Sequence, residues 1–256
     1  MSASHPYFDN GGLPVALAHR GFSLDGLENS MAAFQSAVDL GYRYLETDAH
    51  GTSDGVAVAL HDESLDRTTD ASGIVAERSW NDVQTARIGG IEPVPRLEDV
   101  LGTWPDVRVN IDVKGTSGIV PVAQAIERTR SHDRVCLGSF SAYRRRATEK
   151  LLTRPVAKPA AKGEAVEWWL AALVGAKGSG ALADVDALQI PWRSGRVRFL
   201  SRRHIDAAHR AGKFVHVWTI NDPAEMTELL DRGVDGIVSD RADRLKDLLI
   251  ARGQWA

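Results

Sequence analysis

The sequence predicts an α/β protein with the (β/α)8 TIM-barrel fold and a small insertion after the second strand. Strand-like and helix-like segments alternate about eight times along the 256 residues, which is the length and order typical of such a barrel. Polar side chains follow several of the strand-like runs, where a barrel carries its chemistry. The main rival is a doubly wound open sheet, but no glycine-rich dinucleotide fingerprint follows the first strand. Residues 1–256 are therefore expected to form one domain.

The first half of the chain gives clear boundaries for its elements. Asn29 and Ser30 can cap a helix that stops at Gly41, and Asp54-Gly55 indicates a tight turn between two strands. Prolines and glycines break residues 63–104, which we interpret as the insertion, with a short helix at 97–101. Strands are predicted at 14–18, 43–48, 56–60, 107–113 and 134–137, and longer helices at 31–40, 120–130 and 143–152.

The second half continues the alternation. A short extended piece at 154–157 precedes a helix at 164–174. Ser201 and Gly212 bound another helix, and Asp222-Pro223 opens the next one at the position that proline favours. Strands are predicted at 185–190, 213–220 and 234–238, and helices at 201–211, 223–232 and 241–251.

Composition excludes several classes of protein. Apolar residues make up 43% and charged residues 25%, as in an ordinary globular protein. The net charge of −3 argues against nucleic acid as a partner. The single cysteine, Cys136, allows no intrachain disulfide, and we see neither a signal peptide nor an apolar stretch of about 20 residues. These features favour a cytoplasmic protein. A monomer or a homodimer is expected, and the sequence does not choose between them.

Two carboxylates define the candidate site. Glu46 and Asp48 are two positions apart on a strand and therefore point to the same side. Such like charges repel unless a cation lies between them. Asp112 would add a third carboxylate from another strand end. Three acidic ligands suit Mg²⁺ or Ca²⁺ better than Zn²⁺, with Mn²⁺ as a further candidate.

Two histidines and two cations accompany these carboxylates. His19 and His61 both follow apolar strands, and a histidine pair can serve as acid and base near neutral pH. Arg20 and Lys114 would add positive charge, so a phosphate ester is the natural ligand. Trp218, near a strand end, is a candidate wall for an apolar or glycerol part of the substrate.

Other conspicuous residues carry a weaker signal. His50 sits at the predicted hairpin and is expected to be exposed and inert. The run Arg144-Arg145-Arg146 is interpreted as a solvated helix face. Trp168 and Trp169 are neighbours on one helix and face different ways, so at least one should be partly exposed. The sequence allows these two residues to form either an oligomer contact or a weak membrane-surface contact.

Taken in order, these residues resemble the glycerophosphodiester phosphodiesterases, and the resemblance spans nearly the whole chain. The ordered set is far more specific than any one motif. It consists of His19-Arg20-Gly21, Glu28-Asn29-Ser30, Glu46-Thr47-Asp48, Thr52 to Gly55, His61-Asp62 through Thr69 and Gly73, Pro95 to Glu98, Asn110 to Lys114, Trp218 to Asn221, and Gly233 to Ile237.

The resemblance implies a barrel with an insertion after its second strand and a divalent metal on Glu46, Asp48 and Asp112. It also implies His19 and His61 as the acid/base pair, with Arg20 and Lys114 near the phosphate of a small glycerophosphodiester. Many family members carry Glu where Asp112 stands, so this shorter ligand would bind directly or through water. Ser30 and Arg96 replace the commoner Thr residues. Residues 154–180 match no motif, and headgroup selectivity is expected there.

The resulting hypothesis is metal-dependent hydrolysis of glycerophosphodiesters to glycerol 3-phosphate and an alcohol, by histidine acid/base catalysis. The nucleophile is water or a glycerol hydroxyl that first gives a cyclic phosphate, and either histidine can be the acid. One rival is a phospholipase D-type lyase that cuts lysolipids to a cyclic phosphate. The run from His61 to Thr69, the single cysteine and the missing signal peptide argue against it. A non-catalytic barrel that binds phosphate ligands is the second rival, and the presence of both histidines argues against that one.

Overall fold

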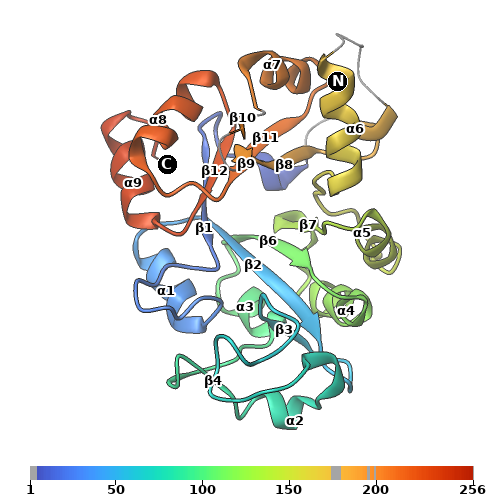
Figure 1. The fold of residues 1–256 in the computed structure, drawn as a ribbon. Helices are drawn as coiled ribbons and strands as arrows, with labels where there is room; N and C mark the ends of the chain where they lie inside the picture. Colours follow the sequence, from blue (N-terminus) through green and yellow to red (C-terminus); the bar gives the residue numbers. More distant parts are fainter. Residues whose placement is uncertain (1–4, 174–179, 195–196, 199, 256) are drawn as a thin grey trace.

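The computed structural model describes residues 5–173, 180–194, 197–198 and 200–255. Within these residues, seven parallel strands lie in the order β7-β6-β2-β1-β12-β11-β8, and β3 pairs antiparallel with β2. Figure 1 shows helices arranged around these strands. The strands are β1 (Val15–His19), β2 (Tyr44–Gly51), β3 (Ala57–Ala59), β4 (Arg87–Ile88), β5 (Glu92–Pro93), β6 (Arg108–Val113), β7 (Val135–Gly138), β8 (Ala187–Pro191), β9 (Arg193–Ser194), β10 (Val197–Arg198), β11 (Phe214–Trp218) and β12 (Gly236–Ser239).

An extended segment joins the two ends of this row of strands. The Leu137 N–H of β7 donates to the Ala157 carbonyl at 2.7 Å, and a parallel bridge links Pro159 to Ala187 of β8. The segment around residues 157–159 therefore takes the place of the eighth strand, and the predicted (β/α)8 barrel is confirmed. The closing segment overlaps the short extended piece expected at 154–157 only at residue 157 and continues beyond it.

Two of the helices begin at side-chain caps that the sequence predicts. The Ser30 hydroxyl accepts the Ala33 N–H at 3.1 Å, and Asp222 caps the helix that starts at Pro223. The bounds agree with the predicted ones to within a few residues, except that residue 174 lies outside the described part. The helices are α1 (Met31–Asp39), α2 (Trp80–Val83), α3 (Leu97–Thr103), α4 (Ile119–Thr129), α5 (Ala142–Glu149), α6 (Lys162–Leu173), α7 (Arg202–Arg210), α8 (Pro223–Arg232) and α9 (Ala242–Ala251).

Alternation along the strands separates the core from the site. On β1 and β2, Leu17 and Tyr44 pack inside the barrel near its amino end, against Tyr7 and Phe8 from the short 3-10 helix Pro6–Phe8. Ala18 and Leu45, one position on, instead join the larger core cluster that includes α1 and α9 residues. Side chains alternate along each strand. The side chains that point into the barrel are therefore apolar near the amino end and polar at the carboxyl end.

The segment between β3 and α3 forms a small unit of its own beside the barrel. It contains α2 and the hairpin β4–β5, and its apolar side chains form a separate cluster around Leu65, Val75 and Ile88. These elements lie at the bottom of Figure 1, far from α6 and α7. That residues 63–104 are an insertion within one domain stays a prediction.

The structure corrects the expected solvated face of α5. The Arg145 side chain is fully buried and pairs with Glu164 of α6 at 2.9 Å, whereas Arg146 is 53% exposed and contacts the same carboxylate at 2.6 Å. A helix turns by about 100° per residue, so neighbouring arginines face different surroundings. Trp168 is buried and Trp169 only partly, as expected. No helix in the described ranges is long and apolar enough to span a membrane.

Candidate active site

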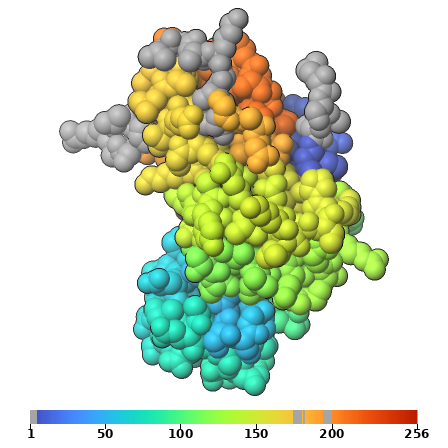
Figure 2. Space-filling model, turned by 90° about the vertical axis from the view of Figure 1, so that its right-hand side faces the viewer, coloured from blue at the N-terminus to red at the C-terminus, as the bar shows by residue number. Residues whose placement is uncertain are grey.

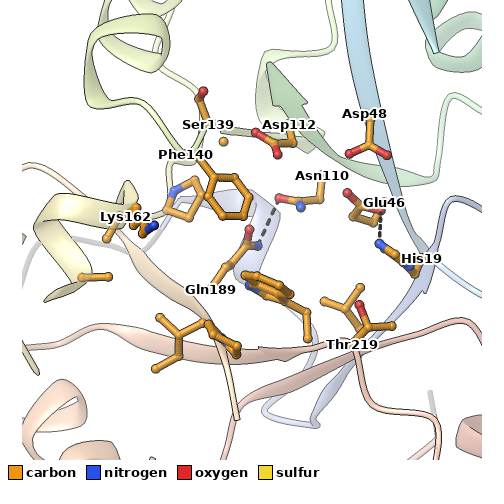
Figure 3. A pocket seen from close by; sticks show the side chains of 18 of the residues that line it. His19, Glu46, Asp48, Asn110, Asp112, Ser139, Phe140, Lys162, Gln189 and Thr219 are labelled. Atoms are coloured by element: carbon orange, nitrogen blue, oxygen red, sulfur yellow. Dashed lines mark hydrogen bonds and ion pairs between the residues drawn. The ribbon is translucent and has the colours of Figure 1, made fainter. Parts of the chain in front are cut away.

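The carboxyl ends of the strands open into a pocket of about 690 Å³ (Figure 3). The barrel brings together side chains that lie up to about 200 positions apart in the sequence. All of the predicted site residues line this one pocket: His19, Arg20, Glu46, Asp48, His61, Asp112, Lys114 and Trp218.

Strand register sets the order of the polar groups. His19 of β1 lies beside Glu46 of β2, and Asp48 of β2 lies beside Asp112 of β6. Asp48 is nearly fully buried, and its two oxygens contact Lys114 Nζ at 2.8 Å and Arg20 Nε at 3.0 Å. Burial opposes its ionisation, but these two cations outweigh burial and lower the pKa of Asp48.

Glu46 has no lysine or arginine side chain in direct contact within the described part of the chain. Its Oε2 accepts the Arg20 backbone N–H at 3.2 Å and lies 3.7 Å from His19 Nε2. Burial, followed by the charge of Asp48, raises the pKa of Glu46 to about 7. This buried carboxyl is therefore short of positive charge at neutral pH.

Asp112 has one paired and one unpaired oxygen. Its Oδ2 lies 2.8 Å from Lys114 Nζ, while its buried Oδ1 has no hydrogen-bond partner. An unpaired buried oxygen next to the carboxyls of Asp48 and Glu46 fits a hard divalent cation. In the described part of the chain, however, no three His, Cys, Asp or Glu side chains are already arranged around a common metal position.

Each predicted histidine is held by an aspartate. His19 Nδ1 lies 2.6 Å from Asp240, which also accepts from the Asn221 amide at 2.7 Å. Burial alone would lower the pKa of His19, but Glu46 and Asp240 outweigh burial and raise it. With Nδ1 bonded to the carboxylate, Nε2 is the ring nitrogen that faces Glu46 (Figure 3).

His61 has a matching arrangement with a different aspartate. Its Nδ1 lies 2.6 Å from the Asp62 carboxylate, and the same carboxylate accepts from Arg67 Nε at 2.6 Å. The hydrogen bond from Arg67, followed by that from His61, lowers the pKa of Asp62, although desolvation acts against it. The contact with Asp62 fixes the orientation of the His61 ring.

The loop after β1 adopts a backbone conformation that most residues avoid. Arg20 and Asn29 have positive φ angles of 55° and 60°. This left-handed conformation costs about 1 kcal/mol or more at such residues and persists where surrounding contacts enforce it. Asn29 donates to Asp48 at 3.3 Å and accepts from the Thr47 hydroxyl at 2.8 Å, so its side chain fixes the carboxylate strand.

The expectation that His50 is exposed is wrong. His50 belongs to the fully buried strand β2, and its Nε2 lies 3.1 Å from the backbone carbonyl of His61. Burial lowers the pKa of His50. The strand continues further toward the hairpin than predicted, and η3 (Thr116–Gly118) covers it. The contact indicates a structural role that positions the His61 backbone.

Sequence reasoning missed several residues that hold the site. Asp240 was not singled out, Asn29 was noted only as a helix-cap candidate and as part of a motif, and Asp62 was noted only as part of a motif. The signal for Asp62 is its position directly after His61. Asp240 directly follows β12, at the barrel edge where functional residues gather, but only the closed barrel brings it to His19.

The fold defines an α/β-barrel enzyme, and its candidate site lies at the carboxyl edge of the strands. The chain belongs to the glycerophosphoryl diester phosphodiesterase family, whose model matches residues 19–244. A Mycobacterium tuberculosis protein named probable glycerophosphodiester phosphodiesterase 2 is 46% identical over 244 residues, which are 94% of this chain and 92% of that protein.

Solved structures are similar over the whole barrel. A glycerophosphodiester phosphodiesterase from Agrobacterium tumefaciens superposes with a TM-score of 0.76 at 25% identity, covering 92% of this chain and 99% of that one. An Oleispira antarctica phosphodiesterase, solved with its product sn-glycerol-3-phosphate, has a TM-score of 0.76 at 21% identity, covering 93% and 97%. The second similarity shows the fold alone.

Proposed function

We propose that this protein hydrolyses glycerophosphodiesters to glycerol 3-phosphate and an alcohol. The observation that carries the proposal is the meeting of three carboxylates, two cations and two aspartate-bound histidines in one pocket. Family membership and the 46% identical relative support it. Fold alone would not, because barrels host many chemistries.

Glu46, Asp48 and Asp112 would hold one divalent cation. Mg²⁺ or Ca²⁺ is favoured over Mn²⁺. The raised pKa of Glu46 and the unpaired Asp112 Oδ1 support this assignment. When bound, such a cation stabilises charge on phosphoryl oxygens. Direct ligation by all three carboxylates would require the Lys114 ammonium to leave its place between Asp48 and Asp112.

Arg20 and Lys114 are the proposed phosphate ligands. Both line the pocket and are paired with carboxylates that a cation would neutralise. Their positive charge would then be available for phosphate oxygens, and Arg suits a two-point contact. Trp218 is proposed as a wall for the glycerol part of the substrate, since its ring lines the same pocket.

His19 and His61 are the proposed proton carriers. Both line the pocket together with the buried carboxylates, and each has Nδ1 fixed by an aspartate. One would take a proton from the attacking hydroxyl and the other would give one to the leaving alcohol oxygen. The attacking group is water or the neighbouring glycerol hydroxyl.

The test is release of glycerol 3-phosphate by the chelated protein after add-back of Mg²⁺, Ca²⁺ or Mn²⁺. Glycerophosphocholine, glycerophosphoethanolamine and glycerophosphoinositol would be compared. Product that forms only with metal supports the proposal. A cyclic phosphate as the final product, seen by phosphorus NMR, would instead favour the lyase. Binding of these compounds without formation of any product would favour a binding protein.

A further inference from the structure

The small unit between β3 and α3 extends one arginine side chain back toward the site. Arg67 lies on a turn closed by the hydrogen bond from the Thr69 N–H to the Leu65 carbonyl, at 3.1 Å. Leu65 is buried in the apolar cluster of this unit, and Thr69 forms a bridge to Ile88 of β4. In Figure 2 the unit, in teal, forms the lower end of the molecule. The backbone of Arg67 is therefore fixed from outside the barrel.

The guanidinium group of Arg67 lies between two carboxylates. Its Nε and Nη2 donate to the two oxygens of Asp62, at 2.6 and 3.1 Å. Its Nη1 and Nη2 donate to the two oxygens of Glu28, at 3.2 and 2.7 Å. Such two-point contacts fix the orientation of both partners as well as their distance. Without Arg67, the two neighbouring carboxylates would repel each other.

Each of these carboxylates also contacts a residue of the proposed site. Asp62 Oδ1 lies 2.6 Å from Nδ1 of His61. Glu28 Oε1 accepts from Nη1 of Arg20 at 2.9 Å. A single side chain, Arg67, is therefore linked through one carboxylate to a proposed proton carrier and through another to a proposed phosphate ligand.

Glu28 and Asp48 together hold the guanidinium group of Arg20. Its Nη1 donates to Glu28, and its Nε lies 3.0 Å from Asp48 Oδ2. A cation bound to Asp48 would weaken the second contact and leave Glu28 as the main partner of Arg20. Burial alone would raise the pKa of Glu28, but Arg67 and Arg20 outweigh burial and lower it. Glu28 is therefore ionised at neutral pH and can hold Arg20 by charge.

Arg67 sets the orientation of the Glu28 carboxylate. It donates to both oxygens, whereas Arg20 donates to Oε1. Without Arg67, the carboxylate would be free to turn and to bind Arg20 through both oxygens, because the two-point contact is the stronger one. Arg20 would then be drawn toward Glu28 and would be less available to a phosphate group.

Packing separates this contact from an ordinary surface ion pair, which has little effect when both side chains are mobile. Leu27, the residue before Glu28, packs against the apolar cluster of the small unit. A Cβ atom at Gly89 of this unit would lie only 2.6 Å from Leu27 Cδ2. The loop after β1 and the small unit therefore meet in a close contact, which holds the backbones of Glu28 and Arg67 at a fixed separation.

We propose that Arg67 is a positioning residue of the active site, which holds Arg20 through Glu28 and His61 through Asp62. The small unit thereby contributes to the reaction, although none of the residues 63–104, all of which the structure describes, lines the pocket. The inference rests on the proposed function and adds a residue to the site that performs it.

The first experiment compares Arg67→Gln with the matched control Arg128→Gln. The Arg67 side chain is 48% exposed. The Arg128 side chain is 54% exposed and pairs at 2.8 Å with Glu98, which also contacts a second arginine, Arg96. The kcat/KM for glycerophosphocholine should fall at least about 10-fold in Arg67→Gln, as for other residues that orient a functional group. It should stay unchanged in Arg128→Gln.

Thermal unfolding of both variants shows whether loss of the fold contributes. Both arginines are about half exposed, so both variants should keep a Tm close to that of the wild type. Equal kcat/KM in the two variants overturns the inference but keeps the proposed function. No hydrolysis by the wild type with any of the three metals overturns the proposed function and, with it, the inference.

Arg67→Lys covers the case in which Arg67→Gln does not fold. Lysine keeps the positive charge but is a point charge, so it cannot make two-point contacts with both carboxylates. The kcat/KM of this variant should lie between those of the wild type and Arg67→Gln. Wild-type kinetics in Arg67→Lys would overturn the claim that Arg67 acts by orienting its partners.

Two further variants separate the two links. Glu28→Gln weakens the hold on Arg20 and should raise KM by at least about 10-fold, the effect of losing a charged hydrogen bond. Asp62→Asn weakens the hold on His61 and should lower kcat by at least about 10-fold. Arg67→Gln should change both constants. A change confined to kcat overturns the link to Arg20, and a change confined to KM overturns the link to His61.

The double variant Arg67→Gln/Glu28→Gln tests whether the two residues act as one unit. If Glu28 draws Arg20 away once Arg67 is lost, removing the charge of Glu28 relieves part of the loss. The combined loss in kcat/KM should then be clearly smaller than the product of the two single losses, as for residues in one network. Single losses that multiply in the double variant would overturn the link between Arg67 and Glu28.

Discussion

Asp240 Oδ1 lies 2.6 Å from Nδ1 of His19, although 221 positions separate the two residues in the chain. The contact directs Nε2 of His19 toward the pocket, and the Asn221 amide in turn holds the aspartate. Asp240 is therefore placed to act through His19, by fixing which nitrogen carries the exchangeable proton.

Replacing Asp240 with Asn should lower kcat by about 10- to 100-fold with a smaller change in KM, because an orienting partner of a functional histidine is lost. The pKa of His19 should also fall, since a negative charge that raises it is removed. The pH profile of kcat/KM would report this shift. Asp243→Asn, which alters the nearby pair with Arg241, is the control. Equal kinetics in both variants would contradict the role.

His19→Ala and His61→Ala should each reduce turnover by at least ~100-fold if both residues carry protons. His209 provides a matched control. It also lies 2.8 Å from an aspartate, Asp235, but it is absent from the pocket lining. His209→Ala should keep near-normal turnover. Near-normal activity in either pocket variant would contradict the assignment of that histidine as a proton carrier.

Metal binding should be visible without turnover. At a metal concentration of 100 times Kd, binding should stabilise the chelated protein by about 2.7 kcal/mol, which corresponds to a rise in Tm of about 5–10 °C for a chain of this size. Glu46→Gln should abolish most of the rise, whereas Asp39→Asn on the exposed side of α1 should not. If none of Mg²⁺, Ca²⁺ and Mn²⁺ changes the Tm, the proposed metal ligands are wrong.

Arg145→Met should destabilise the fold by about 3 kcal/mol or more, because it leaves buried Glu164 with one partner fewer. Arg146→Met removes a contact with the same carboxylate from an exposed position and should cost about 1 kcal/mol or less. Urea unfolding of the two variants measures the difference. Equal losses would show that burial of Arg145 has no energetic consequence.

The buried, neutral His216 ring should lower the free energy of unfolding in mild acid. Burial lowers its pKa to about 4, with Asp235 acting weakly in the opposite direction, against an unfolded value of about 6.5. Between these values the unfolded state binds a proton that the folded state does not. The free energy of unfolding should therefore fall as pH drops from 6.5 to 4, by about 3 kcal/mol in total.

His216→Asn tests this linkage through the change in the free energy of unfolding with pH, and not through the free energy of unfolding at a single pH. Urea unfolding at pH 7 and pH 5 should show that the variant loses about 2 kcal/mol less than the wild type over this interval. Other titrating groups contribute equally to both proteins and cancel in the comparison. The same pH dependence in both would mean that His216 is not buried as a neutral ring.

The site could largely be predicted from the sequence where local geometry decides the direction of a side chain. Glu46 and Asp48 face one way because a strand alternates, and strand ends meet at one edge because the strands are parallel. The same reasoning failed for His50 and Arg145. Their burial depends on which other segment covers that stretch of strand or helix, and neighbouring residues do not reveal it.

By itself the sequence determined the alternating barrel, the family motifs and the side chains that converge at its carboxyl edge. Only the tertiary structure decided that Asp240 reaches His19, that Glu164 pairs with buried Arg145, and that one face of α6 extends the pocket. The first set follows from backbone periodicity, which acts over a few residues. The second depends on how separate elements pack, and packing joins residues whose spacing in the chain carries no record of the contact.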